Sequence, residues 1–196
     1  MTRNKKVTIL DYGLGNLMSV SRAIEKTGGK PIIIDDPNEI VKADYLVLPG
    51  VGNFSVAIQE LVNRNFQEPL EAYSELNRPM LGICLGMQLL FDSSDEQGFH
   101  EGLGFISGSV KAIPTENSFG KKNKIPHIGW GNINIEDKNE NNNIFKKDDN
   151  GKYYYFVHSY QGIPENKSNL LATTRYNDIK ITAAVKKDLI IGCQFH

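Results

Sequence analysis

Short apolar runs alternate with helical patterns through the first half of the chain. Four runs have the length and composition of buried strands: 6–11, 31–35, 44–49 and 79–83. Between and after them, helical patterns cover 18–28, 54–61, 68–76 and 85–91. Continuous apolar strands separated by amphipathic helices are typical of βαβ units and of a parallel sheet that helices cover on both faces. This half of the chain therefore predicts an α/β fold.

The second half has a different pattern. Strand-like runs occupy 153–157, 169–174, 179–185 and 189–195, and 102–113 is typical of a turn and a short strand. These runs leave no room for helices between them, so most must pair through short turns as an antiparallel or mixed portion. Segments 115–124 and 134–151 are rich in Asn, Lys and Asp and are expected to be surface loops. We predict one domain over 1–196, with a central, mostly parallel but mixed sheet flanked by helices and an antiparallel C-terminal portion.

Composition and charge narrow the function classes. The 196 residues carry 22 basic and 23 acidic side chains, a net charge of −1, which argues against a dominant nucleic-acid or anionic-membrane surface. Two cysteines cannot form a disulfide framework, and no His, Cys and Asp cluster has metal-ligand spacing. No apolar run is long enough to span a membrane. We expect a reduced, cytoplasmic protein without metal or cofactor.

The segment Gly82-Ile83-Cys84-Leu85-Gly86 joins an apolar strand to a helical pattern. It has the form of a nucleophile elbow, glycine-x-nucleophile-x-glycine, in which flanking Cβ atoms would clash in the sharp turn. A helix that begins there is expected to lower the thiol pKa and to present backbone N–H groups to an oxyanion. The alternative is a buried structural cysteine in a βα turn.

A cysteine nucleophile needs a base, and four histidines are available: His100, His127, His158 and His196. His158 and His196 both end strand-like runs, where sheet proteins place their sites, and spacing alone does not choose between them. The turn Pro49-Gly50-Val51-Gly52 follows another predicted parallel strand. It is expected at the same sheet edge, where a backbone N–H could pair with that of Leu85 around an oxyanion; the alternative is an ordinary βα turn with positive φ at Gly50 or Gly52.

Five segments in one order resemble the class I glutamine amidotransferases. They are LPGVGNF (48–54), PMLGICLGMQLLF (79–91), IPHIGW (125–130), YYYFVHSY (153–160) and GCQFH (192–196). The similarity runs from Ile9 to the last residue, outside the two polar loops, and is greatest to the glutaminase subunits of imidazole glycerol phosphate synthases in histidine biosynthesis.

The resemblance implies that Cys84 attacks the side-chain amide of glutamine and that His196, rather than His158, is the base. It implies a thioester that is hydrolysed to glutamate, and ammonia that a synthase partner, a (β/α)8 barrel in that group, receives through a protected channel. The residues that the resemblance assigns to the oxyanion are Gly52 and Leu85, and those that it assigns to glutamine are Gly50, Gln88, Glu96, His158, Ser159 and Tyr160. His127 and Trp130 match the segment that would face the partner.

Three departures from that pattern keep alternatives open. Gly131 stands where Asn is usual, Gln161 stands where a second Tyr is common, and 97–104 suits glutaminases that feed sugar amidotransferases in surface-polysaccharide assembly. The family continues after this histidine to a Glu that orients it, so the sequence is expected to be truncated at its C-terminus. Without that Glu, a catalytically impaired scaffold subunit is a further alternative, as is a cysteine hydrolase or redox-sensing relative with another substrate.

Overall fold

The computed structural model describes residues 5–117, 119–136 and 144–196, and the first half has the predicted βα alternation. The strands are β1 (Lys6–Leu10), β2 (Lys30–Ile34), β3 (Leu46–Leu48) and β4 (Met80–Ile83). The helices are α1 (Leu17–Lys26), α2 (Phe54–Asn63), α3 (Gln67–Glu75) and α4 (Leu85–Leu89). Asn16 and Asn53 cap α1 and α2 with side-chain oxygens that accept backbone N–H groups, so each helix begins where an Asn satisfies its free donors.

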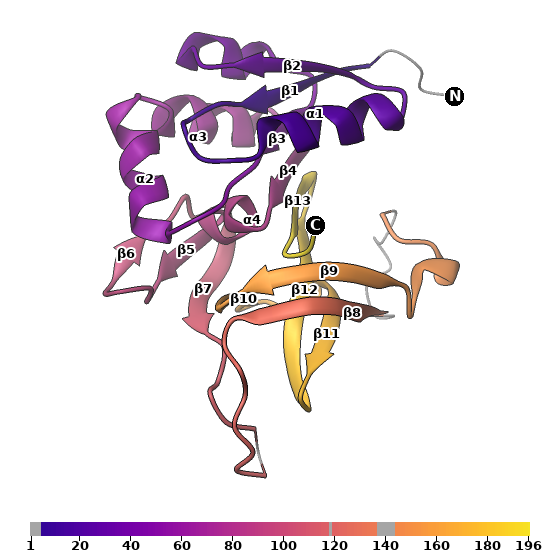
Figure 1. Cartoon of the computed structure of the whole chain (residues 1–196). Helices are drawn as coiled ribbons and strands as arrows, with labels where there is room; N and C mark the ends of the chain where they lie inside the picture. Colours follow the sequence, from indigo (N-terminus) through magenta and orange to yellow (C-terminus); the bar gives the residue numbers. More distant parts are fainter. Residues whose placement is uncertain (1–4, 118, 137–143) are drawn as a thin grey trace.

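The second half extends the same sheet with antiparallel strands, as predicted. These are β8 (His127–Ile135), β9 (Tyr153–His158), β11 (Leu170–Tyr176), β12 (Ile179–Lys187) and β13 (Ile190–Cys193). The strand order of this large sheet is β2-β1-β3-β4-β13-β12-β11-β8-β9. β13 pairs parallel to β4 and antiparallel to β12, and is therefore the junction between the two portions (Figure 1).

A second, four-stranded sheet was not predicted. Its order is β10-β7-β5-β6, formed by β10 (Tyr160–Pro164), β7 (Ile106–Ala112), β5 (Phe91–Ser94) and β6 (His100–Glu101). The short strand expected within 102–113 is β7. The helix expected over 85–91 ends at Leu89, because Phe91 already belongs to β5. β10 follows β9 after Ser159 alone, so the chain crosses from one sheet to the other at that residue.

Short 3-10 helices and loops connect these elements. The 3-10 helices of the described residues are η1 (Pro37–Lys42), η2 (Lys147–Asp149) and η3 (Lys167–Asn169). The described parts of 115–124 form a loop with one isolated bridge, between Glu116 and Lys122. The second predicted loop begins later than expected, because β8 continues to Ile135, and residues 137–143 lie outside the described residues. No helix of the described chain is long and apolar enough to cross a membrane.

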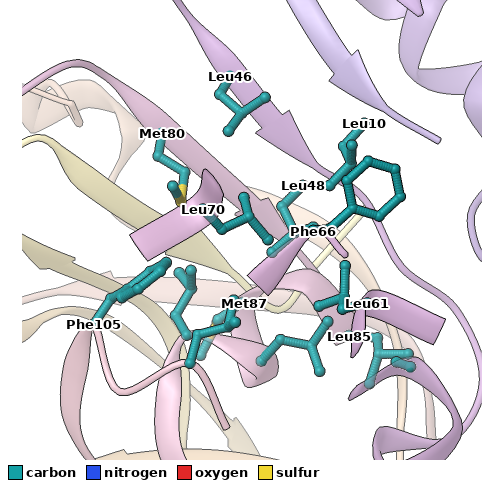
Figure 2. Packing of buried hydrophobic residues seen from close by; sticks show 14 of the residues in the cluster. Leu10, Leu46, Leu48, Leu61, Phe66, Leu70, Met80, Leu85, Met87 and Phe105 are labelled. Atoms are coloured by element: carbon teal, nitrogen blue, oxygen red, sulfur yellow. The ribbon is translucent and has the colours of Figure 1, made fainter. Parts of the chain in front are cut away.

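The main hydrophobic core lies between the helices α2, α3 and α4 and the two sheets. Leu48, Leu61, Phe66 and Met87 are fully buried in it, and Figure 2 shows them packed together with Phe105, which precedes β7. Full burial of such side chains contributes about 1.5–3 kcal/mol each. α4 is buried along its whole length in this core. The core therefore fixes the start of α4, which is where Cys84 lies.

Candidate active site

The sheet order brings three candidate turns together. β4 lies between β3 and β13, and the three strands are parallel, so their carboxyl ends meet at one edge. The Gly50–Gly52 turn follows β3, Cys84 follows β4, and His196 lies three residues beyond β13. Open α/β sheets bind ligands at this edge.

Cys84 occupies a strained turn. Its φ of 55° and ψ of −107° lie outside the regions that side chains with a Cβ favour, and it is the N-cap residue of α4. A Cβ on Gly82 would lie 2.6 Å from the carbonyl oxygen of Gly86. A Cβ on Gly86 would overlap the carbonyl oxygen of Leu48 and lie 2.9 Å from its carbonyl carbon. The predicted need for both glycines of the elbow is confirmed.

The Cys84 thiol is nearly buried, with 8% of the residue exposed. Burial raises the pKa of this thiol and outweighs the Leu85 backbone N–H and the Gln194 side chain, which both lower it. The expectation that the helix start leaves the thiol with a lowered pKa is therefore wrong for the free protein, because desolvation of the thiolate is the larger effect. A base must take the proton before the sulfur can act as a nucleophile.

A cavity of about 320 Å³ opens beside the sulfur and brings most of the predicted residues together. It is lined by Val51, Gly52, Cys84, Leu85, Gln88, Glu96, Pro126, Val157, His158, Ser159, Tyr160 and His196. Gly50 is the one predicted glutamine-binding residue outside this lining. Gly50 is buried in close packing, because a Cβ there would lie 2.6 Å from the hydroxyl of Tyr12 and 2.9 Å from the backbone nitrogen of Gly86.

The two candidate bases differ in whether a ring nitrogen is free. His158 places Nδ1 2.8 Å from the carbonyl oxygen of Tyr160 and Nε2 3.1 Å from Nδ1 of His127. Burial lowers the pKa of His158 to about 4. Within the described chain, no hydrogen bond or carboxylate engages the ring of His196, and none joins it to the Cys84 sulfur. Desolvation lowers the pKa of His196 and keeps its imidazole neutral, so this ring can accept a proton.

The turn after β3 has the positive φ that was expected at one of its glycines. Gly52 has a φ of +107° and borders the cavity. Tyr12, two residues after β1, donates its hydroxyl hydrogen to the carbonyl oxygen of Pro49 over 2.9 Å. Tyr12 is fully buried, and its role was not predicted because no spacing in the sequence distinguishes it. Its hydrogen bond fixes the start of the turn.

Two candidate glutamine-binding side chains are held by the protein itself. Gln88 donates both amide hydrogens, to the carbonyl oxygen of Tyr160 over 3.1 Å and to Oε1 of Gln194 over 3.0 Å. Its own Oε1 remains an acceptor. Glu96 accepts the backbone N–H of Phe54 over 2.7 Å with one carboxylate oxygen, so it also caps the start of α2. Gln194, fully buried, was not predicted, although it lies two residues before His196 on the same segment.

The two predicted partner residues lie differently. Trp130 on β8 is 71% exposed and meets Tyr155 of β9 edge to face, with ring centroids 5.9 Å apart. His127 is only 3% exposed and stacks on Phe156 and Tyr176, so any effect of its side chain on a partner has to be indirect. No group of three His, Cys, Asp or Glu side chains within the described ranges could hold a metal ion.

Comparison with known proteins defines the class. The family model for glutamine amidotransferase class-I matches residues 8–196, and the chain belongs to this family. Two solved structures share the fold: one titled glutamine amidotransferase, with a TM-score of 0.71, 14% identity and coverage of 97% and 89%, and PurLQS from Thermotoga maritima, with a TM-score of 0.68, 18% identity and coverage of 98% and 87%.

Curated relatives are similar over nearly the whole chain. "Imidazole glycerol phosphate synthase subunit HisH 1" of Legionella pneumophila (strain Lens) is 43% identical over 97% of this chain and 90% of the relative. Proteins named "Imidazole glycerol phosphate synthase subunit HisH" are 44% identical in Syntrophotalea carbinolica, over 97% of this chain and 91% of theirs, and 40% identical in Prochlorococcus marinus, over 97% and 85%.

Proposed function

We propose that this chain is the glutaminase subunit of an imidazole glycerol phosphate synthase, which releases ammonia from L-glutamine and passes it to a cyclase partner in the cytoplasm. One observation carries the proposal: Cys84, on a strained elbow, and His196 line the same small cavity. The names of the relatives support the choice of synthase.

The chemistry starts from a protonated thiol. His196 takes the proton from the Cys84 sulfur, and the thiolate attacks the side-chain amide carbon of glutamine. The resulting oxyanion accepts hydrogen bonds from backbone N–H groups at Leu85 and at the Gly52 turn. His196 returns its proton to the leaving nitrogen, ammonia departs, and a thioester remains. Water then hydrolyses the thioester, which gives glutamate and restores the thiol.

The ammonium group of glutamine meets acceptor oxygens of the cavity. Gln88 has both amide hydrogens engaged, so it offers its oxygen to the substrate ammonium group. Glu96 accepts the Phe54 N–H with one oxygen and brings a carboxylate to the lining of the same cavity. Ser159 and Tyr160 line the cavity at the crossing between the two sheets, and we expect them to contact glutamine there. The cavity volume is at the small end of ligand pockets, about 300–1,000 Å³, which suits an amino acid.

The partner docks on the outer side of the β8–β9 pair. Ile128, Trp130, Tyr153 and Val157 are exposed there, and Ile128 pairs directly with Val157 across the two strands. Exposed aromatic and aliphatic side chains in one row are typical of an interface in which Trp is the anchor. Val157 also lines the cavity, so this surface borders the place where ammonia is released. The assembly is a heterodimer.

The test is glutamate release from glutamine by the full chain, with and without its cyclase subunit. We expect the cyclase to stimulate the reaction and Cys84→Ala to abolish it in both conditions. Cys193→Ala is the matched control, because Cys193 is the second cysteine and lies outside the cavity lining. Equal activity of Cys84→Ala and the unchanged protein would refute the proposed nucleophile.

The same assay separates the other functions that the sequence left open. Stimulation by a sugar amidotransferase, with none by a cyclase, would assign the ammonia to polysaccharide assembly. Tight binding of the cyclase without glutamine turnover would indicate a scaffold subunit. Protection of Cys84 by glutamine against a thiol-alkylating glutamine analogue is expected for a glutaminase, and its absence would favour another cysteine hydrolase.

A further inference from the structure

A continuous chain of hydrogen bonds connects the Cys84 sulfur with buried residues of the second half. Gln194 places Nε2 3.6 Å from the sulfur, and Gln88 donates to Oε1 of Gln194 over 3.0 Å. Gln88 also donates to the carbonyl oxygen of Tyr160, which His158 contacts through Nδ1. His127 contacts Nε2 of His158. The four side chains that form these hydrogen bonds are all buried: Gln194, Gln88, His158 and His127.

The donors and acceptors in this chain have only one consistent arrangement. A carbonyl oxygen only accepts, so Nδ1 of His158 carries a hydrogen, and in the neutral ring Nε2 accepts from His127. Gln88 faces two acceptors, the carbonyl oxygen of Tyr160 and Oε1 of Gln194, and must present its NH₂ group to both. A flipped Gln194 would set its NH₂ against that of Gln88. The amide of Gln194 therefore presents an N–H, and not its oxygen, to the sulfur.

We propose that Gln194 is a catalytic residue, which stabilises the Cys84 thiolate through its Nε2–H, and that Gln88 is the positioning residue that fixes this amide. Only the expected effect of Gln194 on glutamine hydrolysis rests on the proposed glutaminase function. Neither substrate nor partner is needed for the N–H to face the sulfur.

Burial of the site increases the effect of the Gln194 N–H on the Cys84 thiolate. Cys84 is nearly buried and Gln194 is fully buried, so little water reaches the sulfur when its charge forms. A hydrogen bond strengthens when its acceptor becomes charged, and its net effect is larger where solvent is excluded. The N–H contact to the neutral thiol is long, at 3.6 Å, and we expect it to shorten once the thiolate forms.

The test measures the ionisation of Cys84 directly, in a Cys193→Ser background that leaves Cys84 as the single thiol. The rate of iodoacetamide alkylation is followed from pH 6 to 11, and its midpoint gives the apparent pKa. We expect Gln194→Met, which keeps the length of the side chain but lacks the donor, to raise that midpoint by about one unit. The midpoint is the readout, because a thiolate of higher pKa is also a better nucleophile and partly offsets the rate at one pH.

Other ionisable groups around the sulfur are common to every variant. They are Tyr12 after β1, Glu96 after β5, His158 on β9 and His196 after β13. Gln161→Met is the matched control: Gln161 is another buried glutamine, whose oxygen accepts the backbone N–H of Thr182, and we expect no shift. Gln88→Met leaves Gln194 in place but free to flip, and a smaller shift in the same direction is expected.

An unchanged midpoint in a folded Gln194→Met protein would overturn the proposal. If that variant does not fold, Gln194→Glu keeps the shape and replaces the donor with an acceptor, so a midpoint equal to that of the unchanged protein would overturn the proposal equally. Glutamate release is measured in parallel. If Gln194→Met shifts the midpoint but the unchanged protein does not hydrolyse glutamine, the role of Gln194 is upheld and the glutaminase function is refuted. If the unchanged protein hydrolyses glutamine but Gln194→Met leaves the midpoint unshifted, the glutaminase function is upheld and the role of Gln194 is refuted.

Discussion

Replacement of Gly86 by Ala tests the packing that forms the elbow. Gly86 lies inside α4 with an ordinary φ, so helix propensity alone predicts that Ala stabilises the protein by about 1 kcal/mol. The structure predicts the opposite sign. The new Cβ would overlap the carbonyl oxygen of Leu48 and lie 2.9 Å from its carbonyl carbon, so the backbone of α4 has to move away from β3.

The size of the effect follows from these two opposing terms. Overpacking of a well-packed site costs about 1–3 kcal/mol, and here the upper end applies because backbone rather than a flexible side chain must move. Subtracting the gain in helix propensity leaves a net loss of about 2 kcal/mol. For a chain of this size that loss lowers the melting temperature by about 4–8 °C.

Urea unfolding followed by far-ultraviolet circular dichroism measures this loss. Gly151→Ala is the control for backbone strain without a clash, because Gly151 has a φ of +81° and no atom within 4 Å of the added Cβ. We expect it to cost about 1 kcal/mol. A Gly86→Ala protein as stable as the unchanged protein, or more stable, would refute the close contact between α4 and β3.

Three further predictions concern the remaining parts of the site. His158 has a pKa of about 4 in the folded protein and 6.5 when unfolded. Between these values the unfolded chain binds more protons, so the free energy of unfolding falls by about 3 kcal/mol from pH 6.5 to 4. Urea unfolding at several pH values should show that this free energy depends less steeply on pH in His158→Asn. Trp130→Ala should weaken cyclase binding by at least about 2 kcal/mol in calorimetry and leave stability unchanged. Phe99→Ala is the control, because Phe99 is also 71% exposed, and it should change neither cyclase binding nor stability. In Glu96→Gln the new side chain can still accept the Phe54 N–H, so the substitution should cost at most about 1 kcal/mol of stability. It should nevertheless raise the KM for glutamine about tenfold. Asp95→Asn, at the exposed ion pair with Lys111, is the control and should leave the KM unchanged.

The hydrophobic pattern was sufficient for most of the large sheet. Strands β1, β4, β11 and β12 coincide with apolar runs, since each has buried residues. β2 also coincides with an apolar run, although its residues are only half-buried or exposed. β8 was missed because its run contains Gly129 and Gly131, residues that usually interrupt strands. β5 was missed because Phe91 is its one large apolar side chain. Its burial depends on contacts with distant residues, which local patterns do not contain.

The candidate site was predictable where backbone geometry demands particular residues. The glycines around Cys84 are required by close backbone contacts, so their spacing alone indicates the elbow. The direction of the thiol pKa could not be read in the same way, because it depends on burial by both halves of the chain. Gln194 and Tyr12 act through hydrogen bonds to residues more than 30 positions away, and no local spacing marks them.

The two halves of the chain contribute different parts of the chemistry. The parallel half holds Cys84 on its elbow, with a raised thiol pKa, so the mechanism proposed above starts with proton transfer to His196. His196 belongs to the other half, and its backbone N–H donates to the carbonyl oxygen of Tyr155 over 2.8 Å. Tyr155 also packs against Trp130 on the exposed surface. If the proposed partner moves Trp130, Tyr155 can transmit that movement to the backbone of His196, the proposed base. We therefore expect glutamine hydrolysis to depend on that partner.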